Sequence, residues 1–361
     1  MKRRDFITSA SAGTLGAAVA APAIAQSKVR WKMVTTWPKN FPGLGTGAEY
    51  LAELIGEMSG GRLEVRVYGG GELVPPLEAF DAVSGGTAEM GHGAAYYWKG
   101  KSEASQFFAA VPFGLNAQEM NGWLYHGGGL ELWREVYGQF GLMPLVAGNT
   151  GVQMGGWFNK EINNLEDIKG LKMRIPGLAG EVLRRAGGTP VLLPGGEIYQ
   201  ALESGTIDAT EWVGPYNDLA FGLHRAAKYY YYPGWHEPGT TIETFVNQAA
   251  FDQLPADLQA IVRGAAQAAN TDMLAVFTAR NNQALQTLIE DHGVELRQFP
   301  EEVLSRLKSL ADEVVAEVAE QDAMAKKVFE SFAAFRSQAI AWHDVSERAY
   351  LNARATRTVK S

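Results

Sequence analysis

The chain has 361 residues, a formal net charge of −8 at neutral pH and no cysteine. Without cysteine it forms no disulfides, thiolate metal sites or cysteine nucleophiles. An acidic chain with no basic cluster argues against nucleic acid and anionic lipid as partners. This length corresponds to about two domains, and a hydrophobic content of 46% suffices for full cores.

The first 25 residues have the pattern of an export signal. A twin-arginine pair, Arg3-Arg4, precedes a weakly apolar run over 7–20, and Ala23-Ile24-Ala25 supplies the small residues that a signal peptidase recognises. The run is too short and too rich in Gly and Ser to span a bilayer. We therefore predict a twin-arginine signal peptide over 1–25, cleavage after Ala25 and a periplasmic location. The alternative is a basic N-terminus of a cytosolic protein.

Strands and helices alternate in the first part of the chain. Residues 29–36 have a strand pattern, and the apolar positions between Tyr50 and Met58 mark one face of a helix that ends near Gly60. Apolar and polar residues then alternate over 63–67, as in a half-buried strand. Strands separated by helices indicate α/β layering with largely parallel sheets.

Two segments, 79–89 and 198–208, align without a gap. Each indicates a helix that ends at Gly-Thr, followed by an acidic residue and a new strand. Each then leads into an aromatic loop that contains glycine, 91–98 in the first case and 211–216 in the second. One such unit per lobe would place two similar loops on opposite sides of a cleft. Chance similarity between two ordinary helix-to-strand turns would give the same alignment.

From residue 249 the chain is mostly helical, with interruptions at Leu254-Pro255 and at a strand predicted over 294–299. Residues 301–342 carry long amphipathic periodicity and several aromatic side chains. This apolar surface exceeds what one small lobe needs to cover itself. The segment could pack on a partner chain, and a helix lying across both lobes of one chain would have the same pattern.

Enzyme motifs are weak or absent. Residues 43–48 fit the dinucleotide fingerprint in form, but Trp37–Pro42 separates them from the preceding strand. The histidines form no metal-binding motif, and no nucleophile elbow is present. His92 and His236 lie in aromatic loops and could line a pocket, although an ordinary hydrogen-bonded loop histidine is the simpler interpretation of each.

Arg174 is the most informative position. It stands between Met173 and Ile175 in a strand-like run that ends at Pro176, and ligands of open α/β sheets bind just beyond the strand ends. A guanidinium there can hold a carboxylate through two parallel hydrogen bonds. Gln153 and Glu211 offer oxygens for a hard cation beside it. The pattern therefore predicts a site for a small anion and a metal ion, with an ordinary surface arginine as the alternative.

The run Leu165–Ile175 resembles the signature of solute receptors of TRAP (tripartite ATP-independent periplasmic) transporters, the DctP type. Residues 149–157, 205–216 and 229–235 resemble the branch that binds 2-oxo acids or lactate, typified by the sodium- and pyruvate-binding α-keto acid receptor. The likeness covers essentially the whole chain. It implies a two-lobed α/β periplasmic solute-binding fold, with mixed sheets flanked by helices, a hinge between the lobes and a long C-terminal helix.

The resemblance also implies roles for individual residues. Arg174 would pair with the substrate carboxylate. A cation, Na⁺ or Ca²⁺, would contact the carboxylate and 2-oxygen of the substrate, and its ligands would be Gln153, the Glu211 carboxylate and the Trp212 carbonyl. Replacement of Arg174 by Ala should abolish binding and leave the fold intact.

Further residues of the resemblance surround this centre. Glu237 matches a cleft acid that could contact metal or substrate, and the pocket would be lined by Asn149, Tyr96 and Tyr97. His236-Glu237-Pro238 departs from the typified α-keto acid receptor, which has a second Trp before the Glu and Gly after it. This departure leaves open the role of Glu237 and the size of the pocket for the substrate tail.

We expect lobe I to comprise 26–148 and about 238–285, and lobe II to comprise 149–237 and about 286–319. A C-terminal dimerisation helix and tail would occupy 320–361. The expected function is a non-catalytic receptor, a homodimer, that delivers a small 2-oxo acid (pyruvate-like) or 2-hydroxy acid (lactate) to the membrane subunits of a TRAP transporter. The same fold could instead bind a dicarboxylate, an aromatic acid or a sialic acid. A periplasmic enzyme acting on 2-oxo acids, with Glu211, His236 or Glu237 as its base, is a further alternative.

Overall fold

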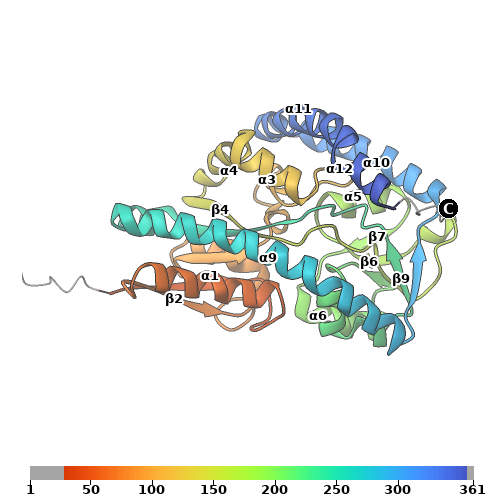
Figure 1. The fold of residues 1–361 in the computed structure, drawn as a ribbon, viewed down its shortest axis with the longest axis horizontal. Coiled ribbons are helices and arrows are strands. Elements are labelled where there is room, and N and C mark those ends of the chain that lie inside the picture. Colours follow the sequence, from red (N-terminus) through yellow and green to blue (C-terminus); the bar gives the residue numbers. More distant parts are fainter. Residues whose placement is uncertain (1–27, 356–361) are drawn as a thin grey trace, which may run out of the picture.

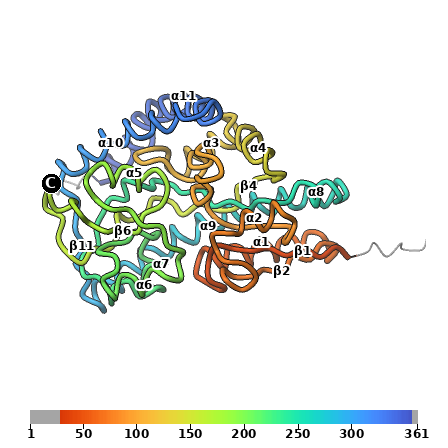
Figure 2. Tube along the Cα trace, turned by 180° about the vertical axis from the view of Figure 1, so that it is seen from behind, coloured from red at the N-terminus to blue at the C-terminus, as the bar shows by residue number. Residues whose placement is uncertain are grey.

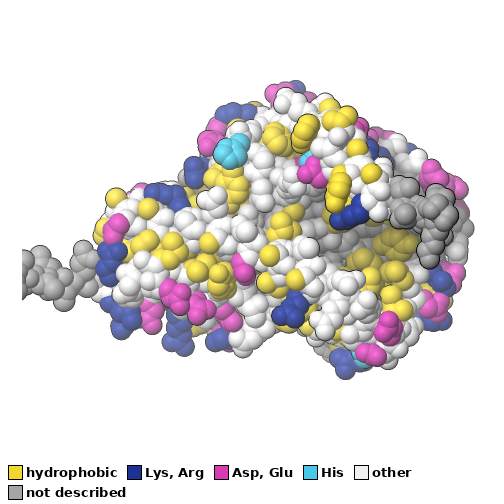
Figure 3. Space-filling model, in the orientation of Figure 1, with side chains coloured by type: hydrophobic (Ala, Val, Ile, Leu, Met, Phe, Trp, Pro, Cys, Tyr) yellow, Lys and Arg dark blue, Asp and Glu magenta, His cyan; other side chains and the backbone are white. Residues whose placement is uncertain are grey.

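The computed structural model describes residues 28–355, which form two α/β lobes, each built on one mixed sheet (Figure 1). Residues 1–27 and 356–361 lie outside the described residues, and so does the predicted signal peptide with its cleavage after Ala25. Within the described range, no helix has both the length and the apolar character needed to cross a membrane. On the face shown in Figure 3, acidic and basic side chains are interspersed along the edges of the molecule.

The sheet of lobe I has the strand order β2-β1-β3-β10-β4. Its strands are β1 (Val29–Thr35), β2 (Leu63–Tyr68), β3 (Met90–Gly93), β4 (Leu142–Asn149) and β10 (Thr241–Asn247). Helix α1 (Leu44–Met58) follows β1, and its buried face, which includes Leu51 and Ile55, packs in one core with Leu63 and Val65 of β2. The predicted strand, helix and strand between residues 29 and 67 are therefore confirmed.

The sheet of lobe II has the order β11-β9-β5-β8-β6-β7. Its strands are β5 (Gly156–Phe158), β6 (Lys172–Arg174), β7 (Thr189–Val191), β8 (Ala209–Thr210), β9 (Tyr229–Tyr232) and β11 (Glu295–Gln298). The helices along this part of the chain are α5 (Gly177–Arg185), α6 (Gly195–Glu203) and α7 (Pro215–Phe221). Short 3₁₀ turns lie at η1 (Pro76–Glu78), η2 (Ala95–Trp98), η3 (Glu103–Phe108), η4 (Leu165–Ile168) and η5 (Leu223–Arg225).

Part of each sheet repeats the same topology. In lobe I, β1 pairs in parallel with β2 and β3, and the antiparallel strand β10 lies beside β3. In lobe II, β6 pairs in parallel with β7 and β8, and the antiparallel strand β5 lies beside β8. Helix α2 (Ala79–Ser84) before β3 and helix α6 before β8 are therefore equivalent. The alignment of 79–89 with 198–208 thus falls on corresponding elements of the two lobes.

The prediction of largely parallel sheets holds inside these two units and for the pair of β9 with β11. Strands β10 and β5 are antiparallel to their neighbours because each enters its sheet from a segment that crosses from the other lobe. Both sheets are consequently mixed, as the family resemblance implied.

Two crossing segments join the lobes side by side. Residues 150–155 lead from β4 to β5, and residues 233–240 lead back from β9 to β10. The backbone N–H of Gln153 donates to the Glu237 carbonyl at 3.1 Å, and the N–H of Gly234 donates to the Gln153 carbonyl at 3.1 Å. A Cβ at Gly234 would lie 2.2 Å from the same Gln153 oxygen, so this close approach requires glycine.

A long helix, α9 (Ala256–Glu290), follows the short helix α8 (Gln248–Asp252) and extends along both lobes (Figures 1 and 2). It contacts β4 and α1 in lobe I and α7 in lobe II. At the start of α7, the backbone N–H of Tyr216 donates to Oδ1 of Asn281 on α9 at 3.0 Å. Helix α9 therefore contacts both lobes as one continuous helix.

The C-terminal region forms the helices α10 (Glu301–Ala319), α11 (Ala323–Val345) and α12 (Glu347–Ala355). Helix α10 packs on α5 of lobe II, whereas α11 packs on α3 (Ala117–His126) and α4 (Gly129–Gly138) of lobe I. On α11, Phe332 meets the Trp123 ring edge-on, with centroids 5.2 Å apart. These helices lie across both lobes of one chain, which is one of the two arrangements that the sequence left open.

The predicted amphipathic run over 301–342 contains a break that the sequence analysis missed. Asp322 caps the start of α11, because its carboxylate accepts hydrogen bonds from the backbone N–H groups of Met324 and Ala325, each at 2.8 Å. An acidic N-cap of this kind begins a new helix and ends the preceding periodicity.

Candidate functional site

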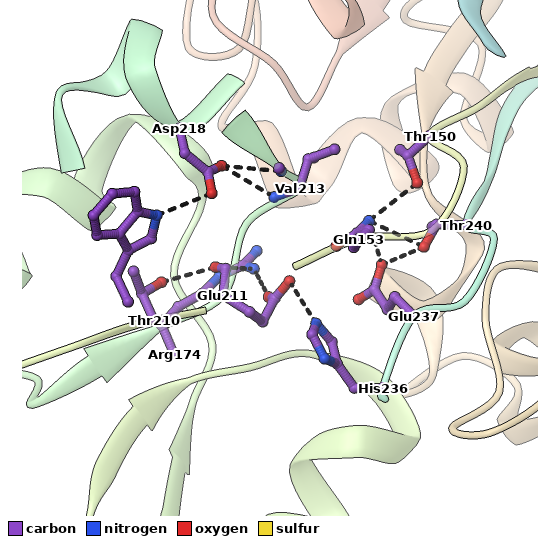
Figure 4. Close-up of polar contacts among 12 residues, drawn as sticks. Thr150, Gln153, Arg174, Thr210, Glu211, Val213, Asp218, His236, Glu237 and Thr240 are labelled. Atoms are coloured by element: carbon purple, nitrogen blue, oxygen red, sulfur yellow. Dashed lines mark hydrogen bonds and ion pairs between the residues drawn. The ribbon is translucent and has the colours of Figure 1, made fainter. Parts of the chain in front are cut away.

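The candidate site lies where the two lobes meet (Figure 4). Arg174 ends β6 and Glu211 directly follows the parallel strand β8, so both emerge at one edge of the lobe II sheet. Gln153 belongs to the first crossing segment, and His236 and Glu237 belong to the second. All five residues are buried, with exposed fractions of 3% or less.

The Arg174 guanidinium is held from several sides. Its Nη1 forms an ion pair with Oε1 of Glu211, its Nη2 donates to the Tyr97 hydroxyl at 3.2 Å, and its Nε donates to the Leu193 carbonyl at 3.1 Å. The Trp212 ring lies 5.2 Å from the guanidinium carbon, in cation–π geometry. Burial opposes the charge, but the Glu211 carboxylate together with Tyr97 and Tyr96 outweighs it, and the pKa of Arg174 is raised. Arg174 is therefore a fixed positive charge.

Gln153 is oriented so that its amide oxygen stays available. Its Nε2 lies 2.9 Å from Oε2 of Glu237, 3.1 Å from the Thr240 hydroxyl and 3.2 Å from the Thr150 hydroxyl. Oε1 of Gln153 is buried and has no hydrogen-bond partner among the described residues. Because the partners of the nitrogen set the orientation of the amide, the oxygen is presented as a ligand for a cation.

Glu211, His236 and Glu237 bring possible metal ligands together. One ligand atom of each lies within 4.8 Å of the others. Oε2 of Glu211 lies 3.4 Å from Nε2 of His236, and neither atom has a hydrogen-bond partner within residues 28–355. Burial, and then the charge of Glu211, raises the pKa of Glu237 well above its ordinary value. A cation would supply the positive charge that two adjacent buried carboxylates need, so these residues fit a metal ion.

The remaining predicted residues lie around this centre in different ways. Tyr96 is buried, its ring packs on Tyr97 with centroids 4.8 Å apart, and burial, followed by the charge of Glu237, raises its pKa. Trp212 contributes its ring to the site, against Arg174. Asn149 ends β4 and is fully buried, but its side chain bonds to the backbone of Gly239 and Gly151. Its predicted role in lining the pocket stays a prediction.

Sequence reasoning missed Asp218, which supports the loop after β8. This carboxylate accepts hydrogen bonds from the backbone N–H groups of Val213 and Gly214 at 3.3 and 3.2 Å. It also accepts from the Trp157 indole at 2.9 Å and the Tyr230 hydroxyl at 2.6 Å. Burial raises the pKa of Asp218 to about 7. The available signal was an acidic residue in the first turn of a helix that begins with Pro215.

Trp37 was also missed, and it connects the lobes. It follows β1, and its ring centroid lies 6.2 Å from that of Tyr97 and 6.1 Å from that of Trp212. Its indole N–H donates to Nδ1 of the buried His92 at 2.8 Å. His92 is therefore a hydrogen-bonded support, as the simpler interpretation held, whereas His236 lies inside the candidate site.

Two lobes that enclose buried polar groups at their joint are the arrangement expected of a solute-binding protein. Residues 33–322 match the model of the family described as bacterial extracellular solute-binding protein, family 7 (DctP). The chain is 45% identical over 360 residues to the monocarboxylate 2-oxoacid-binding periplasmic protein of Nostoc sp., a match that covers 98% of each chain. The protein therefore belongs to the DctP family of TRAP solute-binding proteins, as the resemblance implied.

Two solved structures are similar over nearly the whole chain. One is a TRAP periplasmic solute-binding protein from Pseudoalteromonas atlantica with bound sodium and pyruvate; it has a TM-score of 0.88 and 46% identity, and the match covers 92% of this chain and 100% of that one. The other, from Colwellia psychrerythraea, has bound calcium and pyruvate; it has a TM-score of 0.88 and 47% identity, and the match covers 90% and 99%. The two-lobed fold that the sequence predicted is thereby confirmed.

Proposed function

We propose that this protein is the receptor of a TRAP transporter for a small 2-oxo acid (pyruvate-like) or 2-hydroxy acid (lactate), bound together with Na⁺ or Ca²⁺. The observation that carries the proposal is the buried, charged Arg174 beside unpartnered oxygens of Glu211 and Gln153. Arg174 would hold the carboxylate, and Gln153, Glu211 and the Trp212 carbonyl would hold the cation. The ligands bound in the two similar structures, pyruvate with sodium or calcium, support the proposed class of substrate and ion.

The cation accounts for selectivity. An ion that contacts both the carboxylate and the 2-oxygen distinguishes 2-oxo and 2-hydroxy acids from simple fatty acids. Glu237 would stand next to this ion or the substrate, and Tyr96, Tyr97 and Asn149 would close the pocket. Among the described residues, Arg174 is the one Lys or Arg side chain that is buried, so a second carboxylate would find no matching buried charge. This argues against a dicarboxylate.

The two crossing segments are the proposed hinge. We assign 26–148 with about 238–285 to lobe I, and 149–237 with about 286–319 to lobe II, in agreement with the sheets to which β10 and β11 belong. Closure of the lobes over the substrate would create the shape that the membrane subunits recognise. The family is periplasmic, and we propose that the twin-arginine signal directs export, with cleavage after Ala25.

We further propose that no bond is made or broken at this site, since the family consists of solute-binding receptors. Incubation of the purified protein with pyruvate, followed by product analysis, tests this statement. Turnover would support the enzyme alternative, with Glu211, His236 or Glu237 as the base.

A calorimetric panel tests the ligand class. Protein that has been stripped of metal would be titrated with pyruvate, lactate, butyrate and succinate in the presence of Ca²⁺ and, separately, Na⁺. We expect heat from pyruvate or lactate and none from butyrate, which lacks the 2-oxygen. Binding of succinate alone would contradict the proposal and favour a dicarboxylate receptor.

A further inference from the structure

The second crossing segment places an imidazole among the oxygen ligands of the site. His236 is 1% exposed, and neither of its ring nitrogens has a hydrogen-bond partner among the described residues. His92 is similarly buried, but only its Nε2 lacks a partner, because its Nδ1 accepts a hydrogen bond from Trp37. A buried polar atom without a partner is costly because its desolvation is not compensated, so the unpartnered His236 points to a ligand for its nitrogen.

The geometry between His236 and Glu211 fits two ligands of one ion. Nε2 of His236 lies 3.4 Å from Oε2 of Glu211, which is longer than a good N–H···O hydrogen bond of about 2.7–3.2 Å. Metal bonds of about 2.0–2.1 Å in a tetrahedral site place neighbouring ligand atoms about 3.4 Å apart. Figure 4 shows the His236 ring directed at the Glu211 carboxylate.

The donor set differs from a pure oxygen cage. Glu237 joins Glu211 and His236 within 4.8 Å, and Oε1 of Gln153 is free to join them. Imidazole nitrogen suits Zn²⁺ and related first-row ions, whereas Na⁺ and Ca²⁺ prefer oxygen ligands alone. The negative charges of two glutamates and a substrate carboxylate also exceed the positive charge of one guanidinium. A divalent ion balances the difference.

We propose that His236 is a metal ligand and that, with Glu211 and Glu237, it shifts the preference of this cation site from the Na⁺ or Ca²⁺ of the similar structures towards Zn²⁺. The inference rests on the proposed function, because the ion is the one that contacts the substrate. His236 would then be a metal ligand and not an ordinary hydrogen-bonded loop histidine.

Calorimetric titration of the metal-stripped protein with Zn²⁺ and with Ca²⁺ tests the assignment. Wild-type protein should bind Zn²⁺ at least about tenfold more tightly than Ca²⁺. His236→Asn should weaken Zn²⁺ binding by about 10- to 100-fold or more, since the loss of outer-shell partners alone has that effect. Affinity for Ca²⁺ should stay close to the wild-type value, because Asn offers an oxygen.

His224→Asn is the matched control. His224 stacks on His292 in lobe II, with ring centroids 4.1 Å apart, away from the predicted ligands. This variant should keep the wild-type affinities for both ions. A second measurement needs no variant: Co²⁺-loaded wild-type protein should show a paramagnetically shifted exchangeable imidazole proton in its NMR spectrum.

Equal affinities for Zn²⁺ and Ca²⁺ in the wild type, an unchanged Zn²⁺ affinity in His236→Asn, or a Co²⁺ complex without the imidazole signal would overturn the inference. Calorimetric titration with pyruvate in the presence of Ca²⁺ distinguishes failure of the His236 assignment from failure of the proposed function. If pyruvate still gives binding heat with Ca²⁺, the receptor assignment stands and only the role of His236 is wrong. If pyruvate binds with no ion at all, both fall.

Discussion

Glu211 serves both halves of the proposed site. One carboxylate oxygen pairs with the Arg174 guanidinium, and the other is buried and has no hydrogen-bond partner within the described residues. The Glu211 side chain therefore balances the charge of Arg174, which would hold the substrate carboxylate. It also offers an oxygen to the cation. Because anion and cation would share this neighbour, each should strengthen the binding of the other.

Arg174→Lys keeps a positive charge but loses the planar fork and the contacts to Tyr97 and Leu193. We expect the fold to persist and pyruvate affinity to fall at least about tenfold, because a hydrogen bond to a charged group contributes about 1.5–3 kcal/mol. Calorimetry measures the affinity and circular dichroism the thermal unfolding. Wild-type affinity in this variant would contradict the role of Arg174 as the carboxylate clamp.

Arg174→Ala should also destabilise the fold, which the sequence did not suggest. From the sequence we expected loss of binding with an intact fold, but the guanidinium is the partner of a fully buried Glu211. Removal of one member of a buried ion pair costs about 3–5 kcal/mol. Thermal unfolding should therefore show a marked loss of stability. The double variant Arg174→Met with Glu211→Gln, which removes both charges, should recover part of it.

At the scale of elements, a buried acid links three parts of lobe I. Glu243 on β10 accepts hydrogen bonds from the indole of Trp98 on η2 at 2.6 Å and from the hydroxyl of Tyr137 on α4 at 3.0 Å. Burial raises its pKa to about 8. Since η2 also carries Tyr96 and Tyr97, this network supports the lobe I wall of the site.

The raised pKa of Glu243 predicts a pH dependence of stability. The folded state retains a proton on Glu243 up to pH of about 8, whereas the unfolded state releases it near the ordinary value of 4.5. This contribution is fully present below that ordinary value and decreases as pH rises towards about 8, by at most about 1.4 kcal/mol per pH unit. Asp218 acts in the same direction up to about 7.

Urea unfolding of wild-type protein and Glu243→Gln across this pH range measures the effect. Gln keeps an oxygen that can accept from Trp98 and Tyr137 but does not titrate, so the free energy of unfolding should fall less steeply with pH in the variant. Identical slopes in the two proteins would show that Glu243 is not protonated in the folded state.

The sequence predicted elements better than contacts between elements. Local periodicity was enough for β1, α1 and β2, because each depends on near neighbours in the chain. The pairing of Arg174 with Glu211 depends on the parallel register between β6 and β8, which no local pattern encodes. The motif pattern and the family resemblance placed these two residues in one site, but neither predicted that they pair with each other. The cap at Asp322 was visible in the sequence but was masked by the continuing apolar periodicity.

At the scale of the whole molecule, the C-terminal helices leave apolar side chains uncovered. Four large ones lie at the end of α11 and on α12, with exposed fractions between 46% and 72%: Trp342, Val345, Tyr350 and Leu351. We propose that this C-terminal apolar face packs against a second copy of the chain, which gives the homodimer expected from the sequence. Phe332 and Val328 on α11 are buried within the chain itself.

Light scattering on Trp342→Ser with Val345→Ser tests the dimer. We expect the mass of a dimer for the wild type and of a monomer for the variant, with unchanged unfolding. Truncation after Glu320 is a poorer test, because it would remove Phe332 and Val328 from the core. The matched control is Met58→Ser on α1, where the side chain is 48% exposed. A variant that keeps the dimer mass would exclude this face as the interface.

The coupling between pyruvate and a cation tests the central claim most directly. Calorimetry would measure the pyruvate dissociation constant of metal-stripped protein over increasing Ca²⁺ concentrations. We expect the pyruvate affinity to rise with Ca²⁺ to a plateau, and pyruvate to raise the affinity for Ca²⁺ by the same factor. A pyruvate affinity that is independent of Ca²⁺, Na⁺ and Zn²⁺ would contradict a site in which a metal ion and Arg174 hold the substrate together.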